Sequence, residues 1–206
     1  MSGTEPASDL VSSRERIAAV VLAAGMSTRM GKNKLLLELD GEPLVRRAAR
    51  SALDAGLDPV VVVVGFEAHQ VRRALEGLHV DIVTNHDFRG PSSKSFHSGL
   101  SALPPDVTAA VVILPDMVHV SAETLGRVHA AAGTSSAPLI ASRYGDVTAP
   151  PILFRRPLFD ELLAWEGEGC GKPVVKAYAS EAMYVDWPVE ALDDVDTPED
   201  FARVTA

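Results

Sequence analysis

Small residues and cations follow the first apolar run of the chain in a pattern suited to holding phosphate groups. The run 17–22 is followed by Ala-Ala-Gly, and the loop beyond these residues carries Arg29, Lys32 and Lys34. A glycine lets backbone N–H groups approach an anion without a Cβ in the way, and basic side chains supply the opposite charge. We therefore expect this stretch to bind a nucleotide through Leu22, Ala23, Ala24, Gly25, Arg29 and Lys34.

Two common phosphate-binding loops do not fit the spacing of this stretch. A Walker loop has four residues between its first glycine and its Gly-Lys pair, and then Ser or Thr. Here five residues separate Gly25 from Gly31, and Asn33 follows the lysine. The dinucleotide-binding fingerprint G-x-G-x-x-G also fails, because Met26 and Ser27 follow Gly25. The composition is that of a phosphate loop, but neither standard spacing is present.

A carboxylate follows a second buried strand directly. The apolar run 109–114 is followed by Pro115, Asp116 and Met117. In a parallel sheet, ligands bind beyond the carboxyl ends of the strands, so Asp116 should lie on the same edge as the Gly25 loop. Oxygen ligands suit Mg²⁺, and we expect Asp116 to hold this ion against the phosphates. Alone, Asp116 would be read as a helix cap or a surface carboxylate; the nearby phosphate loop favours the metal site.

The remaining sequence supplies the elements that position these residues. Continuous apolar strands alternating with helices imply a parallel sheet covered by helices. The expected strands are 17–22, 59–64, 80–84, 109–114, 138–142 and 183–186. The expected helices are 43–55, 67–76, one capped by Ser92 or Ser93, 122–132, 157–164 and a last helix capped by Thr197.

Composition narrows the class of protein. The 206 residues, 47% of them hydrophobic, suit a single domain over 15–206 after a flexible polar tail over 1–14. The single cysteine, Cys170, excludes an internal disulfide and favours the reducing cytoplasm. No apolar run approaches a membrane span, and a net charge of −9 without a long basic run disfavours nucleic-acid binding. We expect a cytoplasmic protein with no membrane or nucleic-acid partner.

The stretch Leu22 to Lys34, L-A-A-G-x-S-x-R-M-G-x-x-K, resembles the signature loop of the MobA-like nucleotidyltransferases. The resemblance is closest to the molybdenum cofactor cytidylyltransferases, which carry LAAG where guanylyl-transferring relatives carry LAGG. Further matches lie at 41–44, 114–117 and 192–201. The resemblance implies an α/β fold: a Rossmann-like, doubly wound, mostly parallel sheet of the nucleotidyltransferase type in three α/β/α layers.

The resemblance also implies roles for charged residues. Arg29, Lys34 and Asp116 would be catalytic, the two cations by countering the triphosphate. Asp116 and Asp196 would bind Mg²⁺, since relatives place a metal ligand just before Thr-Pro, and Asp194 is a weaker candidate.

Serines near the start of the third expected helix match nucleotide-contacting serines of the family. Counting back from Gly99-Leu100 places Ser93 and Ser95 at these positions. Lys94 replaces a family serine, and is either an additional phosphate contact or a surface lysine. The resemblance therefore adds Ser93 and Ser95 to the expected nucleotide site.

The implied reaction transfers CMP from CTP to the phosphate of the molybdopterin-type molybdenum cofactor, with release of pyrophosphate. The product would pass to a molybdenum hydroxylase. Ala149-Pro150 stands where the family has Gly-His facing the acceptor, and Lys172 stands in place of an arginine. These departures leave two alternatives: a guanylyl- or other nucleotidyltransferase with a different small phosphorylated acceptor, or a non-catalytic nucleotide- or cofactor-binding chaperone.

Overall fold

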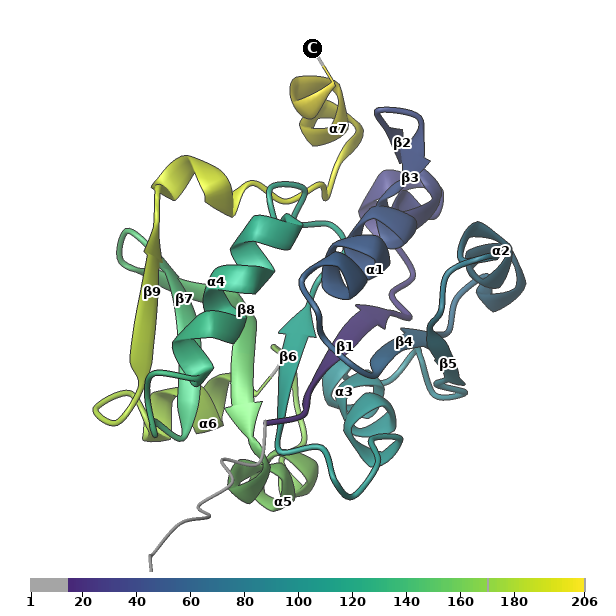
Figure 1. The fold of residues 1–206 in the computed structure, drawn as a ribbon. Coiled ribbons are helices and arrows are strands. Elements are labelled where there is room, and N and C mark those ends of the chain that lie inside the picture. Colours follow the sequence, from purple (N-terminus) through teal and green to yellow (C-terminus); the bar gives the residue numbers. More distant parts are fainter. Residues whose placement is uncertain (1–14, 170, 206) are drawn as a thin grey trace, which may run out of the picture.

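Seven strands form one sheet in the computed structural model, which describes residues 15–169 and 171–205 (Figure 1). The strands are β1 (Ile17–Ala23), β4 (Val60–Val64), β5 (Asp81–Thr84), β6 (Ala109–Ile113), β7 (Leu139–Tyr144), β8 (Val147–Arg155) and β9 (Met183–Trp187). Their order is β5-β4-β1-β6-β8-β7-β9. Strand β8 runs antiparallel to β6 and β7, and the other described pairings in this sheet are parallel. The expected mostly parallel α/β sheet is confirmed.

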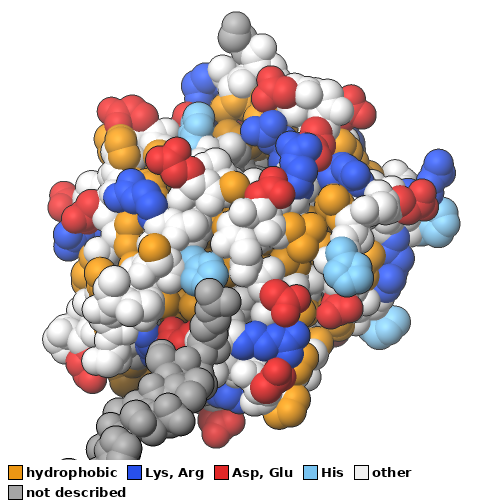
Figure 2. Space-filling view, in the orientation of Figure 1, with side chains coloured by type: hydrophobic (Ala, Val, Ile, Leu, Met, Phe, Trp, Pro, Cys, Tyr) orange, Lys and Arg blue, Asp and Glu red, His pale blue; other side chains and the backbone are white. Residues whose placement is uncertain are grey.

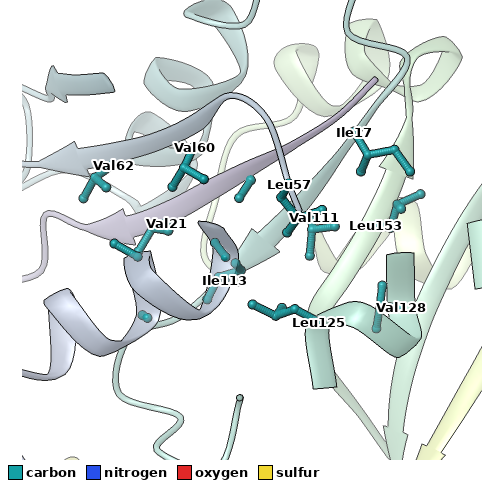
Figure 3. Packing of buried hydrophobic residues seen from close by; sticks show 14 of the residues in the cluster. Ile17, Val21, Leu57, Val60, Val62, Val111, Ile113, Leu125, Val128 and Leu153 are labelled. Carbon is teal, nitrogen blue, oxygen red and sulfur yellow. The ribbon is translucent and has the colours of Figure 1, made fainter. Parts of the chain in front are cut away.

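Helices cover both faces of the sheet and make the three expected layers. They are α1 (Leu44–Asp54), α2 (Ala68–Ala74), α3 (Ser92–Ser101), α4 (Ala122–Ala132), α5 (Phe159–Ala164) and α6 (Lys172–Ala177). Helix α7 (Pro198–Val204) packs instead against a small cluster beyond the sheet, which includes Met30 and Leu44. Alternate residues of β1 point to opposite faces: Val21 belongs to a core cluster with residues of α1, α2 and α4, whereas Val20 belongs to a second cluster with residues of α3, α5 and α6. Figure 3 shows Leu125 and Val128 of α4 in the first of these clusters.

Strand order reverses between β1 and β6. The chain runs outward from β1 through β4 to β5, and then returns to place β6 on the other side of β1. The loop after Gly25 and the turn at Asp116 follow the carboxyl ends of these two neighbouring strands. This reversal point is where open α/β sheets bind ligands, so the fold brings the two candidate segments to one edge.

Strand β8 was not apparent from the sequence, because it contains Pro150 and Pro151, which lack the N–H donors of a strand interior. The register shifts between Ala141 and Ser142, opposite these prolines. Two side chains of β7 bond the proline carbonyls instead: Ser142 Oγ donates to Pro151 O at 2.8 Å, and Tyr144 Oη donates to Pro150 O at 2.9 Å. Side-chain hydrogen bonds thus support a strand that local rules disfavour.

N-cap residues were predicted for two helices, and one of the two predictions is confirmed. Thr197 caps α7 as predicted, in a reciprocal capping box with Asp200. The prediction for α3 is wrong, because Pro91 is its N-cap residue and both serines lie inside the helix. The Ser92 and Ser93 hydroxyls instead accept hydrogen bonds from the backbone of Gly169 and Gly167. They therefore hold a distant glycine-rich loop against the start of α3.

The face of the molecule in Figure 2 carries Lys and Arg side chains interspersed with Asp and Glu side chains. On α1, Arg47 lies 3.2 Å from Asp40, and Arg50 lies 2.5 Å from Glu42. The positive charges of these two arginines are therefore paired with acidic side chains.

Within the described ranges, no helix is long and apolar enough to cross a membrane. The expected tail over 1–14 and the expectation for Cys170 concern residues outside the described part of the chain.

Two glycines inside helices give a matched test of packing between α3 and the sheet. A Cβ on Gly99 would overlap Val20 Cγ1 and lie 3.0 Å from Val63 Cγ2, whereas one on Gly126 of α4 would meet no atom within 4 Å. Thermal unfolding should show that Gly99→Ala destabilises the protein by about 1–3 kcal/mol. Gly126→Ala should stabilise it by up to about 1 kcal/mol, because alanine favours helix. Equal unfolding temperatures for the two variants would contradict this packing.

Candidate active site

A cavity of about 330 Å³ opens at the carboxyl ends of β1 and β6. The predicted residues on its wall are Leu22, Ala24, Gly25, Arg29, Lys34, Ser95, Asp116 and Asp196. They come from four segments that are far apart in the sequence, and the order of the strands brings these segments together. The wall includes both expected metal ligands and both expected phosphate-binding cations.

Two predicted nucleotide residues do not line this cavity. Ala23 is completely buried and belongs to the core cluster on the α1 side of the sheet, because alternation in β1 turns Leu22 and Ala24 the other way. Ser93 is also completely buried, and its hydroxyl accepts a hydrogen bond from Gly167 N at 3.2 Å. Ser92 and Ser95 line the cavity instead, since residues three apart share one face of a helix.

The loop after β1 is folded to direct Lys34 into the cavity. Ser27 adopts a left-handed conformation, with φ 51°, and its hydroxyl accepts a hydrogen bond from Lys34 N at 3.1 Å. Asn33 caps the short 3₁₀ turn Lys34–Leu36 by accepting from Leu35 N at 3.1 Å. Met30 and Leu35 are buried on either side of the lysine. The backbone of Lys34 is therefore held by hydrogen bonds and by apolar contacts.

The C-terminal segment brings Asp196 to the same place. Val195 is completely buried and packs in a small cluster with Met30 and Leu44. Its N–H donates to the carbonyl of Asp116 at 3.0 Å, which ties the segment directly to the turn after β6. A buried apolar side chain and one backbone hydrogen bond thus place Asp196 beside Asp116.

Lys34 links the two aspartates. Its Nζ donates to Asp116 Oδ2 at 2.5 Å and to Asp196 Oδ1 at 2.7 Å. The Lys34 side chain is only 14% exposed, and the two carboxylate side chains are 18% and 23% exposed. Arg29 Nη2 lies 2.7 Å from the other oxygen of Asp196, but the Arg29 side chain is 68% exposed. The site therefore contains a partly buried lysine that bridges two carboxylates, and a more exposed arginine at its edge.

These contacts shift the pKa values of the groups. Burial lowers the pKa of Lys34, but the negative charges of Asp116 and Asp196 outweigh this effect and raise the pKa above its ordinary value. Burial likewise opposes ionisation of Asp196, yet hydrogen bonds and charges from Lys34 and Arg29 lower its pKa. The pKa of Asp194 is raised by desolvation and then by the charges of Asp196 and Asp116. The raised pKa of Lys34 and the lowered pKa of Asp196 thus keep this ion pair charged at neutral pH.

The chemistry of the two carboxylates fits a divalent metal ion. Both bond the same Lys34 nitrogen, so their oxygens converge on one small region at the cavity wall. The described residues include no cluster of three or more His, Cys, Asp or Glu side chains suited to a metal ion. A pair of carboxylates that leaves the other positions to phosphate oxygens and water is typical of Mg²⁺ sites in nucleotide enzymes.

Other residues on the cavity wall were not predicted as nucleotide contacts. Phe88 is half-buried and precedes α3, and Glu168 reaches the wall from the loop held by Ser92. No local spacing in the sequence relates Glu168 to the Gly25 loop. Lys94, for which two roles were open, lies 3.4 Å from Glu166 and is not on the cavity wall.

A second cavity of about 870 Å³ adjoins the first, and Leu114 lines both. Apolar side chains of β8 and of the C-terminal segment form much of its wall, including Ile152 and Leu192. Lys172 and Lys176 of α6 also line this cavity, as does Asp194. The carboxylates at 116 and 196 belong to the first cavity, so the candidate metal site lies close to the boundary of the two cavities.

The fold and the site together define a nucleotidyltransferase: a phosphate-type loop at the point of strand reversal, with paired carboxylates opposite it. Residues 19–182 match the model of the MobA-like NTP transferase domain, so the chain belongs to the MobA-like NTP transferase family. This confirms the family indicated by the signature loop.

Relatives of known name agree with this assignment. The purine catabolism protein PucB of Bacillus subtilis is 30% identical over 201 residues, which cover 91% of this chain and 95% of PucB. The bifunctional protein GlmU of Anaeromyxobacter sp. is 36% identical over 135 residues, or 63% of this chain, and the match spans only 28% of GlmU.

Solved structures show the same fold. Rv0371c from Mycobacterium tuberculosis superposes with a TM-score of 0.82 at 27% identity, covering 93% of this chain and 98% of the Rv0371c chain. A second structure of Rv0371c, in complex with manganese, has a TM-score of 0.75 at 28% identity and covers 92% of this chain and 98% of that chain.

Proposed function

We propose that this protein transfers CMP from CTP to the phosphate of the molybdopterin-type molybdenum cofactor and releases pyrophosphate. The observation that carries the proposal is the convergence of Asp116 and Asp196 on Lys34 of the Gly25 loop, at the boundary of two cavities. One cavity suits a triphosphate and the other an acceptor, and the charged groups lie where the two substrates would meet.

The nucleotide would occupy the smaller cavity. A Cβ at Gly25 would meet no atom within 4 Å, so the absent side chain leaves room for a phosphate beside the backbone. Arg29 and Lys34 supply positive charge on the same wall. Ser95 can donate a hydrogen bond from its hydroxyl. The preference for CTP depends on the resemblance of the LAAG segment to the cytidylyltransferases.

Asp116 and Asp196 would hold Mg²⁺, an assignment supported by their convergence and by the manganese complex of the neighbour Rv0371c. When bound, the ion supplies positive charge to phosphate oxygens and so stabilises the charge that develops during transfer. The carboxylates contribute by fixing its position relative to the Gly25 loop.

The chemical step is a displacement at the α-phosphorus of CTP. An oxygen of the acceptor phosphate forms a bond to the α-phosphorus, and the bond from that atom to the oxygen of the β-phosphate breaks. Pyrophosphate leaves with the electron pair of the broken bond. No general base is needed, because the attacking phosphate oxygen is already ionised. The protein contributes alignment through the two adjoining cavities and charge stabilisation through Lys34 and Arg29.

The acceptor would occupy the larger cavity, where Lys172 and Lys176 can contact an anionic group. The product would pass to a molybdenum hydroxylase in the cytoplasm. Ala149 and Pro150 stand on the wall of this cavity in place of the family's Gly-His. This substitution favours, as the second candidate function, a nucleotidyltransferase acting on a different small phosphorylated acceptor. The paired carboxylates make a chaperone without turnover the weaker reading.

Thermal unfolding with Mg²⁺ and each of CTP, GTP, ATP and UTP tests the nucleotide. We expect CTP to raise the unfolding temperature most, since a ligand at 100 times its Kd adds about 2.7 kcal/mol of stability. A rise with GTP alone would contradict the assignment of CTP. Pyrophosphate release on addition of molybdopterin then tests the acceptor, and a protein that binds CTP without any release would contradict that part.

A further inference from the structure

The cations and carboxylates of the nucleotide cavity are paired with one another. Lys34 bonds both Asp116 and Asp196, and Arg29 bonds Asp196. The cations that could bind phosphates are thus paired with the carboxylates that could bind a metal ion. A bare divalent ion approaching the aspartates meets an ammonium already between them, and a bare triphosphate approaching the lysine meets two carboxylates.

A metal ion and a triphosphate arriving together remove both conflicts. The carboxylates exchange the ammonium for the metal ion, and the lysine exchanges the carboxylates for phosphate oxygens. No charge is left without a partner, whereas either ligand alone would leave like charges facing each other in a site that is largely removed from water. Such unpaired, partly buried charges are costly.

We propose that Lys34 couples metal binding to nucleotide binding, by withholding the Asp116–Asp196 pair from a free metal ion until a triphosphate draws its ammonium away. This role rests on the proposed nucleotidyltransferase function and deepens it. The coupling follows from the contacts of the Lys34 side chain. It gives Lys34 a role in ligand binding, before the chemical step.

Lys34 is better placed for this role than Arg29. Its Nζ contacts both carboxylates, its side chain is 14% exposed, and its backbone is fixed by the Ser27 hydroxyl. Arg29 contacts one carboxylate from a side chain that is 68% exposed, where water weakens the interaction. We therefore expect most of the coupling to be lost with Lys34.

The coupling predicts opposite effects of one substitution on two ligands. In Lys34→Met, the carboxylates lose their bound cation, and the affinity for Mn²⁺ alone should rise about tenfold, a typical size for coupling between sites. The affinity for CTP without metal should fall, because a phosphate partner has been removed. Damage to the fold would lower both affinities, so the opposite signs separate the proposed role from a structural one.

The experiment measures Mn²⁺ binding by electron paramagnetic resonance, and the binding of CTP in EDTA and of preformed Mn·CTP by calorimetry. In the unaltered protein, Mn²⁺ should tighten CTP binding by at least about tenfold. The control is Lys32→Met, which removes an exposed positive charge from the same loop; in the described structure Lys32 forms no ion pair. This control should change the affinity for Mn²⁺ alone by less than about twofold, because exposed charges are screened.

Two results would overturn the inference in distinguishable ways. If the unaltered protein binds Mn·CTP but Lys34→Met leaves the affinity for Mn²⁺ alone unchanged or lower, the coupling role fails and the proposed function stands. If neither CTP nor Mn·CTP binds, and no other triphosphate raises the unfolding temperature, the proposed function fails and the inference fails with it.

Discussion

Replacing Asp116 by Asn should lower kcat for nucleotidyl transfer by about 10³-fold, the upper end of the range for removal of one preorganised electrostatic group. The substitution keeps the size of the side chain but removes the negative charge that accepts a hydrogen bond from Lys34 at 2.5 Å. In the proposed mechanism the same charge holds the metal ion against the phosphates. A neutral amide is a weaker ligand for Mg²⁺, so the loss should appear in kcat at saturating CTP.

The matched control lies near the opposite end of the same strand. Asp106 precedes β6, is exposed, and pairs with Arg16 at 2.7 Å, whereas Asp116 follows β6 at the cavity. Asp106→Asn should leave kcat within about twofold, since exposed ion pairs contribute little. Steady-state release of pyrophosphate measures both variants. Equal activity of Asp116→Asn and the unaltered protein would exclude Asp116 from the reaction.

The sequence was sufficient to predict that the two candidate segments meet at one edge of the sheet, because each is a short local feature of the chain. Gly25 and Asp116 each follow a buried strand directly, and the strands that they follow are neighbours in a parallel sheet. Such an arrangement needs no knowledge of side-chain packing: the carboxyl ends of parallel strands meet at one edge. The general position of the cavity therefore follows from strand order and from two short segments.

The sequence was not sufficient to predict which side chains face the cavity, because a shift of one residue in the start of a helix turns different side chains toward it. Ser93 was expected at the nucleotide, but α3 begins at Ser92, and this phase turns Ser93 into the core and Ser92 and Ser95 toward the cavity. Helix boundaries depend on tertiary contacts, here the hydrogen bonds from the 167–169 loop to both serine hydroxyls. A pattern of serines alone does not contain that information.

Side-chain contacts between segments that are distant in the chain could not be predicted from the sequence either. The resemblance indicated that Asp196 belongs to the site, but only the structure shows that Lys34 and Arg29 already neutralise it. Strand β8 is a similar case, because the hydroxyls of Ser142 and Tyr144 make its two prolines compatible with the sheet. In both cases, side chains from separate elements determine the result.

Replacing Lys34 by Ala should lower the rate of transfer by at least about 10²-fold, measured as pyrophosphate release. The backbone of Lys34 is held by the Ser27 hydroxyl and by the buried residues around it, so its ammonium only has to exchange the carboxylates for phosphate oxygens when the substrates bind. A group held in this way stabilises developing charge without having to reorganise during the reaction. Its loss should therefore lower kcat at saturating substrate, and not only raise KM.

A control variant shows whether the loss of rate comes from the position of Lys34 or only from the lower positive charge of the loop. Lys32 carries the same charge two residues earlier, is exposed, and does not line the cavity. Lys32→Ala should keep kcat within about threefold, because interactions of exposed charges are weak and screened by salt. An equal loss in the two variants would mean that net charge near the loop, and not the position of one ammonium, governs the rate. A large loss in Lys34→Ala alone would assign the effect to the geometry that joins Lys34 to Asp116 and Asp196, since this geometry distinguishes the two lysines.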